Sequence, residues 1–238
     1  MIANGSIGTL DLGDRNMLVT LLAALLLPSA ITALRAEALL HHITRDATLQ
    51  RHTSPFATEA SEPLIRIGHG YDIHRMDTRE KAGQPLIVGG VKFDGSTAPD
   101  FELGCVANSD GDVIYHSVVD AILGAICNPD IGQLFPDGKG SEWKGAESDI
   151  FMVEAYDRMV KRGYAIGNVD VTLICQKPRV NVEHAGKQVK LLMRENVARL
   201  LHTDLSRVNV KARTHENVDS VGEARAIECH VVLIMERQ

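Results

Sequence analysis

Short β-prone runs alternate with helical patterns from about Leu64 to the C-terminus, and this alternation restricts the fold of the chain more than any other feature. The run LIRIGHGYDIH (64–74) is a predicted strand, and the pair Gly89–Gly90 within LIVGGVKF (86–93) indicates a hairpin. Further strands are predicted at 167–176, 208–214 and 225–236, and helices at about 113–126, 149–162 and 183–201. Connections of ordinary length without internal repeats favour one α/β domain.

The beginning of the chain differs in composition from the rest and is interpreted as a targeting leader. Met17–Leu27 is an apolar run that is too short to span a bilayer but suits the apolar region of a secretory signal. Residues 41–60 are rich in His, Thr, Ser and Ala and poor in acids, which is typical of a transit peptide. A signal followed by a transit-like segment indicates import into a plastid that is surrounded by extra membranes.

We therefore expect residues 1–62 to form a cleaved or disordered leader and residues 63–238 to form the folded domain, with no membrane segment in the mature chain. The alternative is a single organelle presequence or a membrane anchor. Asp11 and Asp14, which precede the apolar run, argue against a simple signal peptide.

The overall charge argues against one class of partner. The chain has 31 acidic and 25 basic residues and a net charge of −6, so an extended basic surface for nucleic acid is not expected. A local cationic pocket for phosphates remains compatible with this balance. The four cysteines contain no C-x-x-C pair, which excludes a zinc ribbon.

The strand predicted at GHGYDIH carries ionisable side chains where apolar ones would ordinarily pack. Asp72 and His74 are two residues apart, so both project from one face of a strand, about 7 Å apart along the chain. His69 projects from the opposite face. A carboxylate and an imidazole on one face can bind the same metal ion.

A third ligand is available in the helix predicted after the sequence SDGD. Asp112, His116 and Asp120 recur every four residues and form one polar stripe on that helix. Asp72, His74 and one of these three would make a site with an open fourth position, which is typical of catalytic zinc. We expect Asp120 to accept the second ring N–H of a ligating histidine.

The same residues also have structural interpretations. A D-x-H pair is common on solvated strands, and acids at the start of a helix often cap it. His116 alone can be a hydrogen-bonded core histidine. The residues alone do not decide between these interpretations and a metal site.

Two later segments indicate phosphate chemistry. Thr214–Glu216 follows a predicted strand, and the carboxylate of Glu216 can bind a hard cation such as Mg²⁺. Lys177 and Arg179 flank a proline at the end of another strand, where cations suit a phosphorylated ligand. The residues themselves thus indicate a metal-assisted enzyme that acts on a phosphorylated small molecule.

Five motifs together are far more specific than any one of them. GHGYDIH, SDGDVIYH, DIGQLFPD, GNVDVTLICQKPR and KARTHE occur in that order. From about Arg66 to Glu236 the chain resembles the 2-C-methyl-D-erythritol 2,4-cyclodiphosphate synthase family, which belongs to the non-mevalonate route to isoprenoids. Its tail, HENVDSVGEARAIECHVVLIM, resembles plastid-type members.

The resemblance implies a fold, an assembly and a reaction. The fold is a mixed β-sheet with helices packed on one face, in a homotrimer whose active sites lie between subunits. The substrate is a cytidine diphosphate derivative, 4-diphosphocytidyl-2-C-methyl-D-erythritol 2-phosphate. Its 2-phosphate attacks the β-phosphorus, CMP leaves, and a cyclic diphosphate closes.

The resemblance also implies roles for individual residues. Asp72, His74 and His116 match the zinc ligands, Glu216 matches the ligand of a substrate-bound Mg²⁺ or Mn²⁺ ion, and Thr214 matches a threonine that steadies the transition state. The residues that match substrate contacts are Asp72, His74, Asn108, Ser109, Asp130, Ile131, Gly132, Phe135, Pro136, Asp137, Cys175, Lys177, Pro178, Arg179, Arg213, Thr214, His215 and Glu216.

The chain departs from the family pattern at two of these positions. Asn108 stands where members usually have a histidine that contacts phosphate and aids the transition state, and an amide can donate a hydrogen bond there but brings no charge. Arg179 stands where bacterial members have lysine, and a guanidinium suits phosphate equally well. The alternatives are a non-catalytic trimer that binds a phosphate or nucleotide and a zinc phosphoesterase that gives linear products.

Overall fold

The computed structural model describes residues 61–138 and 140–238, so nearly all of the predicted leader lies outside the described residues. The strands are β1 (Ile65–Thr78), β2 (Ile87–Val88), β3 (Val91–Lys92), β4 (Leu103–Cys105), β5 (Tyr164–Ile174), β6 (Glu183–His184), β7 (Lys187–Gln188), β8 (Val208–Arg213) and β9 (Ala226–Arg237). The helices are α3 (Arg79–Ala82), α4 (Val113–Ala125), α5 (Ile131–Leu134), α6 (Asp149–Lys161), α7 (Val189–Leu200) and α8 (Asp219–Gly222), with a 3₁₀ turn, η1, at Leu205–Arg207.

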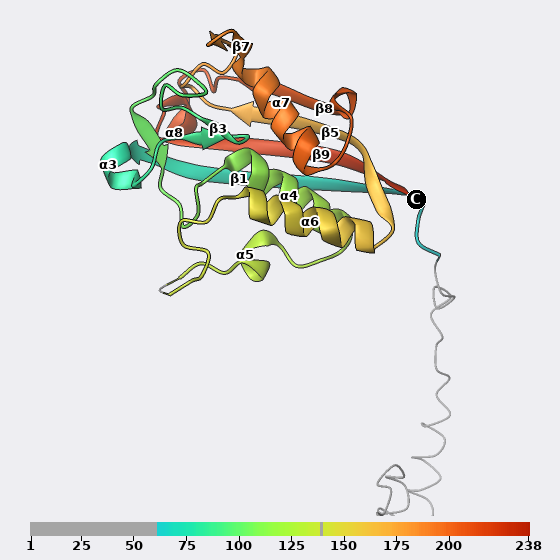
Figure 1. Ribbon diagram of the computed structural model, residues 1–238. Helices are drawn as coiled ribbons and strands as arrows, with labels where there is room; N and C mark the ends of the chain where they lie inside the picture. Colours follow the sequence, from blue (N-terminus) through green and yellow to red (C-terminus); the bar gives the residue numbers. More distant parts are fainter. Residues whose placement is uncertain (1–60, 139) are drawn as a thin grey trace, which may run out of the picture. The chain divides into compact units, whose positions relative to one another are not determined.

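One mixed sheet organises these elements. Its five strands lie in the order β4-β1-β9-β5-β8, and only the β5–β8 pair is parallel. Helices α4, α6 and α7 lie on the same side of the sheet (Figure 1), where α4 packs on β1 and β9, α6 on β5, and α7 on β8. The expected α/β domain with helices on one face of a mixed sheet is therefore confirmed.

The structure corrects the sequence prediction at one helix. Residues 183–201 were expected to form a single helix, but α7 begins only at Val189. The preceding residues form the β6–β7 hairpin, whose turn residues Ala185 and Gly186 have positive φ angles of 49° and 77°. A two-residue turn of this kind reverses the chain, so a continuous helix cannot pass through it. The hairpin predicted at Gly89–Gly90 is confirmed as β2–β3.

The chain is fixed to the domain from its first described residues. The carboxylate of Glu62 pairs with Arg66 and Arg162, each at 2.7 Å, and accepts a hydrogen bond from the Tyr164 hydroxyl. No helix within residues 61–138 and 140–238 is both long and apolar enough to cross a membrane.

Helix α4 lies unusually close to β1 because two glycines face it. A β-carbon added to Gly68 would lie 1.9 Å from the carbonyl oxygen of Ala121, and one added to Gly70 would lie 1.8 Å from that of Ser117. These glycines occupy the same face of β1 as Asp72 and His74, which lie two and four residues after Gly70. The sequence GHGYDIH thus brings the helix against the strand and then presents two polar side chains to it.

Asp112 fixes the start of α4. Its carboxylate accepts the backbone N–H groups of Ile114 and Tyr115 within the helix, and those of Gly89 and Gly90 in the β2–β3 turn. Burial and the neighbouring Asp110 raise the pKa of Asp112 to about 6, and the backbone hydrogen bonds oppose this shift. Both carboxylate oxygens of Asp112 are occupied by these hydrogen bonds, so Asp112 is a structural residue and not a metal ligand.

The close approach of β1 and α4 predicts a matched pair of effects. Gly70→Ala should lower the free energy of unfolding by about 3 kcal/mol or more, because a backbone carbonyl cannot move aside as a flexible side chain can. Gly124→Ala, at an exposed position of α4 with no atom within 4 Å of the added carbon, should be neutral or stabilising by up to about 1 kcal/mol. Denaturant unfolding of both variants measures the difference, and wild-type stability of Gly70→Ala would contradict the proposed packing.

Candidate metal centre and ligand cavities

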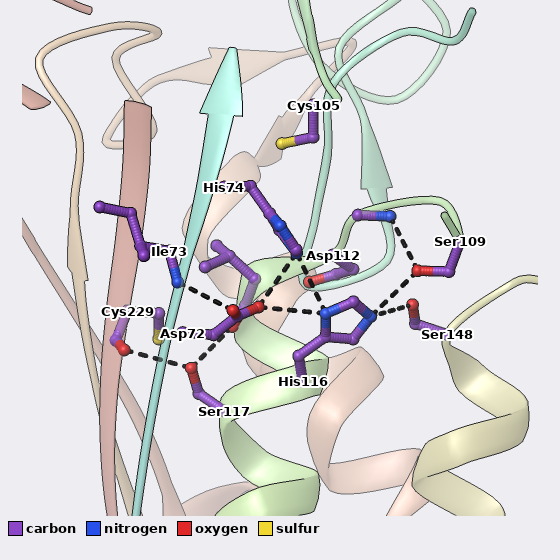
Figure 2. Close-up of polar contacts among 12 residues, drawn as sticks. Asp72, Ile73, His74, Cys105, Ser109, Asp112, His116, Ser117, Ser148 and Cys229 are labelled. Atoms are coloured by element: carbon purple, nitrogen blue, oxygen red, sulfur yellow. Dashed lines mark hydrogen bonds and ion pairs between the residues drawn. The ribbon is translucent and has the colours of Figure 1, made fainter. Parts of the chain in front are cut away.

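Three ligand atoms from two elements meet at the helix-covered face of the sheet. Asp72 Oδ2 lies 3.0 Å from His74 Nε2 and 3.1 Å from His116 Nδ1, and the two ring nitrogens are 3.1 Å apart. Figure 2 shows Asp72 and His74 projecting from β1 toward His116 on α4, while Ile73 points to the other side of the strand. Among the described residues this is the only group of three or more side chains that could share one metal ion.

The spacing and chemistry of these atoms fit a tetrahedral cation. Ligand atoms about 2.0–2.1 Å from tetrahedral zinc lie about 3.3–3.4 Å from one another, close to the separations found here. A carboxylate and two neutral imidazoles all present lone pairs to the same point, an arrangement that a cation stabilises. The site can therefore hold a metal ion through two nitrogens and one oxygen.

Electrostatics favour the ionised form of the carboxylate. Burial raises the pKa of Asp72, but hydrogen bonds and charge interactions with His116 and His74 outweigh it and hold the pKa well below its usual value. Conversely, burial lowers the pKa of His116, and the Asp72 carboxylate more than compensates, so the His116 pKa is raised. Asp72 is thus ready to bind a cation as an anion.

The predicted role of Asp120 is wrong. Its carboxylate accepts the backbone N–H of Ile131 at 2.8 Å and so holds the start of α5. The second ring nitrogen of His116, Nε2, instead lies 2.8 Å from Ser148 Oγ and 3.2 Å from Ser109 Oγ. Periodicity placed Asp120 on the correct stripe of α4, but one helical turn beyond His116 the neighbouring element is α5 and not the metal site.

The metal group lies on the wall of a cavity of about 390 Å³. Residues of helix α5 and the loop after it also line this cavity, where the Phe135 ring packs against that of Phe151 with centroids 4.4 Å apart. Of the predicted site residues, those that line this cavity are Asp72, His74, Asn108, Ser109, His116, Ile131, Gly132, Phe135 and Asp137. Asp130 caps α5 by accepting the N–H of Gln133, and Pro136 lies between two lining residues.

Asn108 holds a buried donor beside the metal group. Its Nδ2 atom is shielded from solvent and has no hydrogen-bond partner among the residues that the structure describes. A buried amide N–H without a partner is costly, so a ligand oxygen in the cavity would satisfy it. This supports a binding role for the residue that departs from the family pattern.

Most of the remaining predicted residues, but not His215 and Glu216, line a second cavity of about 330 Å³, which shares no lining residue with the first. It lies where β5 and β8 end, and its predicted members are Cys175, Lys177, Pro178, Arg179, Arg213 and Thr214. Burial raises the pKa of Cys175 to about 12, so its thiol is a protonated wall residue and not a nucleophile.

The segment after β8 forms a constrained loop. The Thr214 hydroxyl donates to Glu216 Oε1 at 2.8 Å, and His215 pairs with Asp219 at 3.0 Å, which raises the His215 pKa. Glu216, Asn217 and Asp219 have positive φ angles of 51°, 60° and 58°. Strained backbone of this kind clusters at functional sites, so the loop conformation favours a role for Thr214 and Glu216.

Three residues at or beside these cavities were not predicted as site residues from the sequence. Trp143 and Phe151 line the first cavity, and nothing in a one-tryptophan loop or a helix interior marks them in the sequence. Gln176 lies between recognised residues, and its Oε1 accepts the backbone N–H of His215 at 3.3 Å, which ties the loop to the end of β5. Its place inside the QKPR motif was the available signal.

Substitution of the carboxylate tests the metal centre. Wild-type protein should bind about one zinc ion per chain, and Asp72→Asn should lose nearly all of it because an amide is a much weaker ligand than a carboxylate. Asp77→Asn is the matched control: Asp77 lies on the same strand but pairs with Arg75 and Lys81. Zinc content after dialysis measures the result, and equal contents in the two variants would refute the assignment.

Comparisons with known proteins give the family of the chain. Residues 65–236 match the model of the YgbB family. The chain is 45% identical over 195 residues to the chloroplastic 2-C-methyl-D-erythritol 2,4-cyclodiphosphate synthase of Oryza sativa subsp. japonica, over 81% of this chain and 80% of that protein. It is 41% identical over 174 residues to the corresponding synthase of Proteus mirabilis (strain HI4320), over 73% of this chain and 98% of that protein.

A solved structure is similar to the chain in both sequence and fold. The CDP complex of IspF from Plasmodium falciparum is 36% identical in sequence, with a TM-score of 0.61 over 75% of this chain and 99% of that one. The resemblance drawn from the five sequence motifs is confirmed. The chain belongs to the YgbB family, together with the 2-C-methyl-D-erythritol 2,4-cyclodiphosphate synthases that it matches.

Proposed function

We propose that the chain converts 4-diphosphocytidyl-2-C-methyl-D-erythritol 2-phosphate to 2-C-methyl-D-erythritol 2,4-cyclodiphosphate and CMP, in non-mevalonate isoprenoid biosynthesis. The observation that carries this proposal is the convergence of Asp72, His74 and His116 on the wall of a cavity, in a member of this family. The relatives with the same fold are named for this reaction.

The reaction requires two anionic phosphates of one substrate to approach each other. The attacking phosphate is already an anion at neutral pH, so the protein needs no strong general base and acts by positioning and charge compensation. Asn108 and Ser109 lie on the cavity wall beside the metal group and can donate hydrogen bonds to phosphate oxygens. The rings of Phe135 and Phe151 make part of the wall of the same space apolar.

Two kinds of cation complete this proposal. Zn²⁺ held by Asp72, His74 and His116 would neutralise and orient the β-phosphate, while Mg²⁺ or Mn²⁺ would bind the diphosphate beside Glu216. Glu216 is exposed and belongs to no cluster of metal-binding side chains in the described part of the chain, so its ion would take most ligands from the substrate. Thr214, which donates a hydrogen bond to Glu216, is assigned the role of stabilising the transition state.

We assign the second cavity to the cytidine end of the substrate and the first to the erythritol phosphate end. Lys177, Arg179 and Arg213 bring positive charge to the second cavity, which suits a nucleotide. The two cavities share no lining residue. In the proposed trimer, the first cavity of one subunit and the second cavity of its neighbour together form the complete site.

An exposed apolar face supports a homotrimer built from this chain. The side of the sheet away from the helices carries uncovered β-branched and aromatic side chains on β1 and β9, which lie side by side in the sheet. These residues are Ile65, Ile67, Tyr71, Ile73, Val232 and Ile234, with between 37% and 69% of their surface exposed. Monomeric proteins rarely leave such a continuous patch open, so it suits an interface between copies.

The relatives from Oryza sativa and Arabidopsis thaliana are named chloroplastic, which supports a plastid location for this chain and a leader role for residues 1–62. The domain proper is then 63–238. Imaging of the tagged full-length chain tests the location.

The products of the reaction test the proposed function. The wild-type chain with Zn²⁺ and Mg²⁺ should give cyclic diphosphate and CMP in equal amounts, and Asp72→Asn should lower turnover by about 100-fold or more because charge compensation is lost. Asp77→Asn serves again as the control. Linear products, identified by mass spectrometry, would instead indicate a zinc phosphoesterase, and substrate binding without turnover would indicate a non-catalytic homologue.

The uncovered sheet face gives a separate prediction. Val232→Glu should convert a trimer to monomers, because a carboxylate cannot be buried there without a partner, and should abolish turnover because the two cavities separate. Val160→Glu, at a similarly exposed position on α6, should leave the trimer intact. Light scattering measures the number of copies, and a wild-type chain that is monomeric would contradict the proposed assembly.

A further inference from the structure

Ser148 stands at the N-cap of α6 but does not cap it. Serine at this position ordinarily accepts a backbone N–H of the first turn, yet Ser148 makes no such bond and its own backbone is already helical, with φ −70° and ψ −7°. The residue is completely buried. Because the hydroxyl makes no capping bond, it can form hydrogen bonds with other buried groups.

That use is a link between a carboxylate and a metal-binding histidine. The Ser148 hydroxyl donates to Asp110 Oδ1, and its backbone N–H donates to Asp110 Oδ2 at 3.0 Å. On the other side the same Oγ lies 2.8 Å from His116 Nε2 (Figure 2). Asp110 is itself buried and is fixed through its own backbone N–H, which donates to Ala146.

The direction of these hydrogen bonds sets the tautomer of His116. A carboxylate can only accept hydrogen bonds, so the Ser148 hydroxyl donates its single proton to Asp110. Toward the imidazole the same hydroxyl can act only as an acceptor. His116 Nε2 is then the donor in its contact with Ser148, so the lone pair that a neutral His116 offers to a cation is the one on Nδ1, beside Asp72 and His74. That is the form in which Nδ1 binds a cation.

We propose that Asp110 and Ser148 are positioning residues of the metal centre: Ser148, oriented by Asp110, accepts the Nε2 proton of His116 and holds the ring with Nδ1 directed at the cation. This inference rests on the metal site of the proposed function and adds two residues to it. Ser109, whose Oγ also lies 3.2 Å from Nε2, is the weaker partner because of the longer distance.

The experiment compares Ser148→Ala with Ser117→Ala in the full-length chain. Ser117 is equally buried and sits next to His116 on α4, but its hydroxyl donates to the carbonyls of Val113 and Cys229 and makes no contact with the imidazole. Zinc affinity is measured by competition with a chromogenic chelator, in the absence of substrate. Loss of an outer hydrogen-bond partner typically weakens metal affinity by about 10–100-fold, so we expect a loss in this range for Ser148→Ala and a change below about twofold for Ser117→Ala.

A second readout separates positioning from general packing. In zinc-loaded protein labelled with ¹⁵N-histidine, the Nε2–H of His116 should exchange slowly with solvent in the wild type and in Ser117→Ala, and faster in Ser148→Ala, because only that variant removes its acceptor. Asp110→Asn should weaken zinc affinity and speed the exchange of Nε2–H as well, because an amide has one acceptor oxygen and cannot replace both carboxylate oxygens that Ser148 contacts. This variant keeps the test valid if Ser148→Ala fails to fold.

The outcomes are distinguishable. Wild-type zinc affinity and unchanged exchange of the His116 Nε2–H in folded Ser148→Ala would overturn the inference and leave the metal centre standing. An effect of Ser109→Ala in place of Ser148→Ala would assign the role to Ser109 and equally overturn it. A wild-type chain that binds no zinc would overturn the metal centre of the proposed function and the inference together.

Discussion

The close contact between β1 and α4 is the constraint on which the rest of the site depends. Gly68 and Gly70 leave room for the backbone carbonyls of α4 directly above the strand, at distances that no side chain would permit. Asp72 and His74 continue the same face of the strand, so the helix that packs on the glycines carries His116 to the two ligands. One seven-residue sequence therefore sets the close packing of α4 and supplies two of the three side chains of the candidate metal centre.

Three carboxylates around this contact, of Asp110, Asp112 and the half-buried Asp120, are each hydrogen-bonded in a way that fixes an element. Asp112 joins α4 to the β2–β3 turn, Asp120 joins it to α5, and Asp110 joins the start of α6 to the loop before α4. Charged groups are stable in such places only when fully hydrogen-bonded. The acids of the SDGD segment thus build the frame that holds the metal ligands and leave metal binding itself to Asp72 and the two histidines.

Much of this could be predicted from residues close together in the chain. The period-two spacing of Asp72 and His74 placed both on one face of a strand, and the turn-forming glycines marked the β2–β3 hairpin, because these features depend only on local backbone geometry. The choice among Asp112, His116 and Asp120 could not be made in this way. The three share one stripe of the helix, and only the packing of β1, α5 and the β2–β3 turn against that stripe gives each a different partner.

The sequence by itself determined the α/β alternation, the pair of ligands on β1 and, through its five motifs, the family. The family resemblance also pointed to His116, but only the tertiary structure brings it within reach of Asp72 and His74, places Ser148 and not Asp120 at its second nitrogen, and divides most of the predicted contact residues between two cavities. The physical reason is separation along the chain. Ser148 and His116 are 32 residues apart, and no local periodicity links them, so their contact exists only because α6 packs on α4.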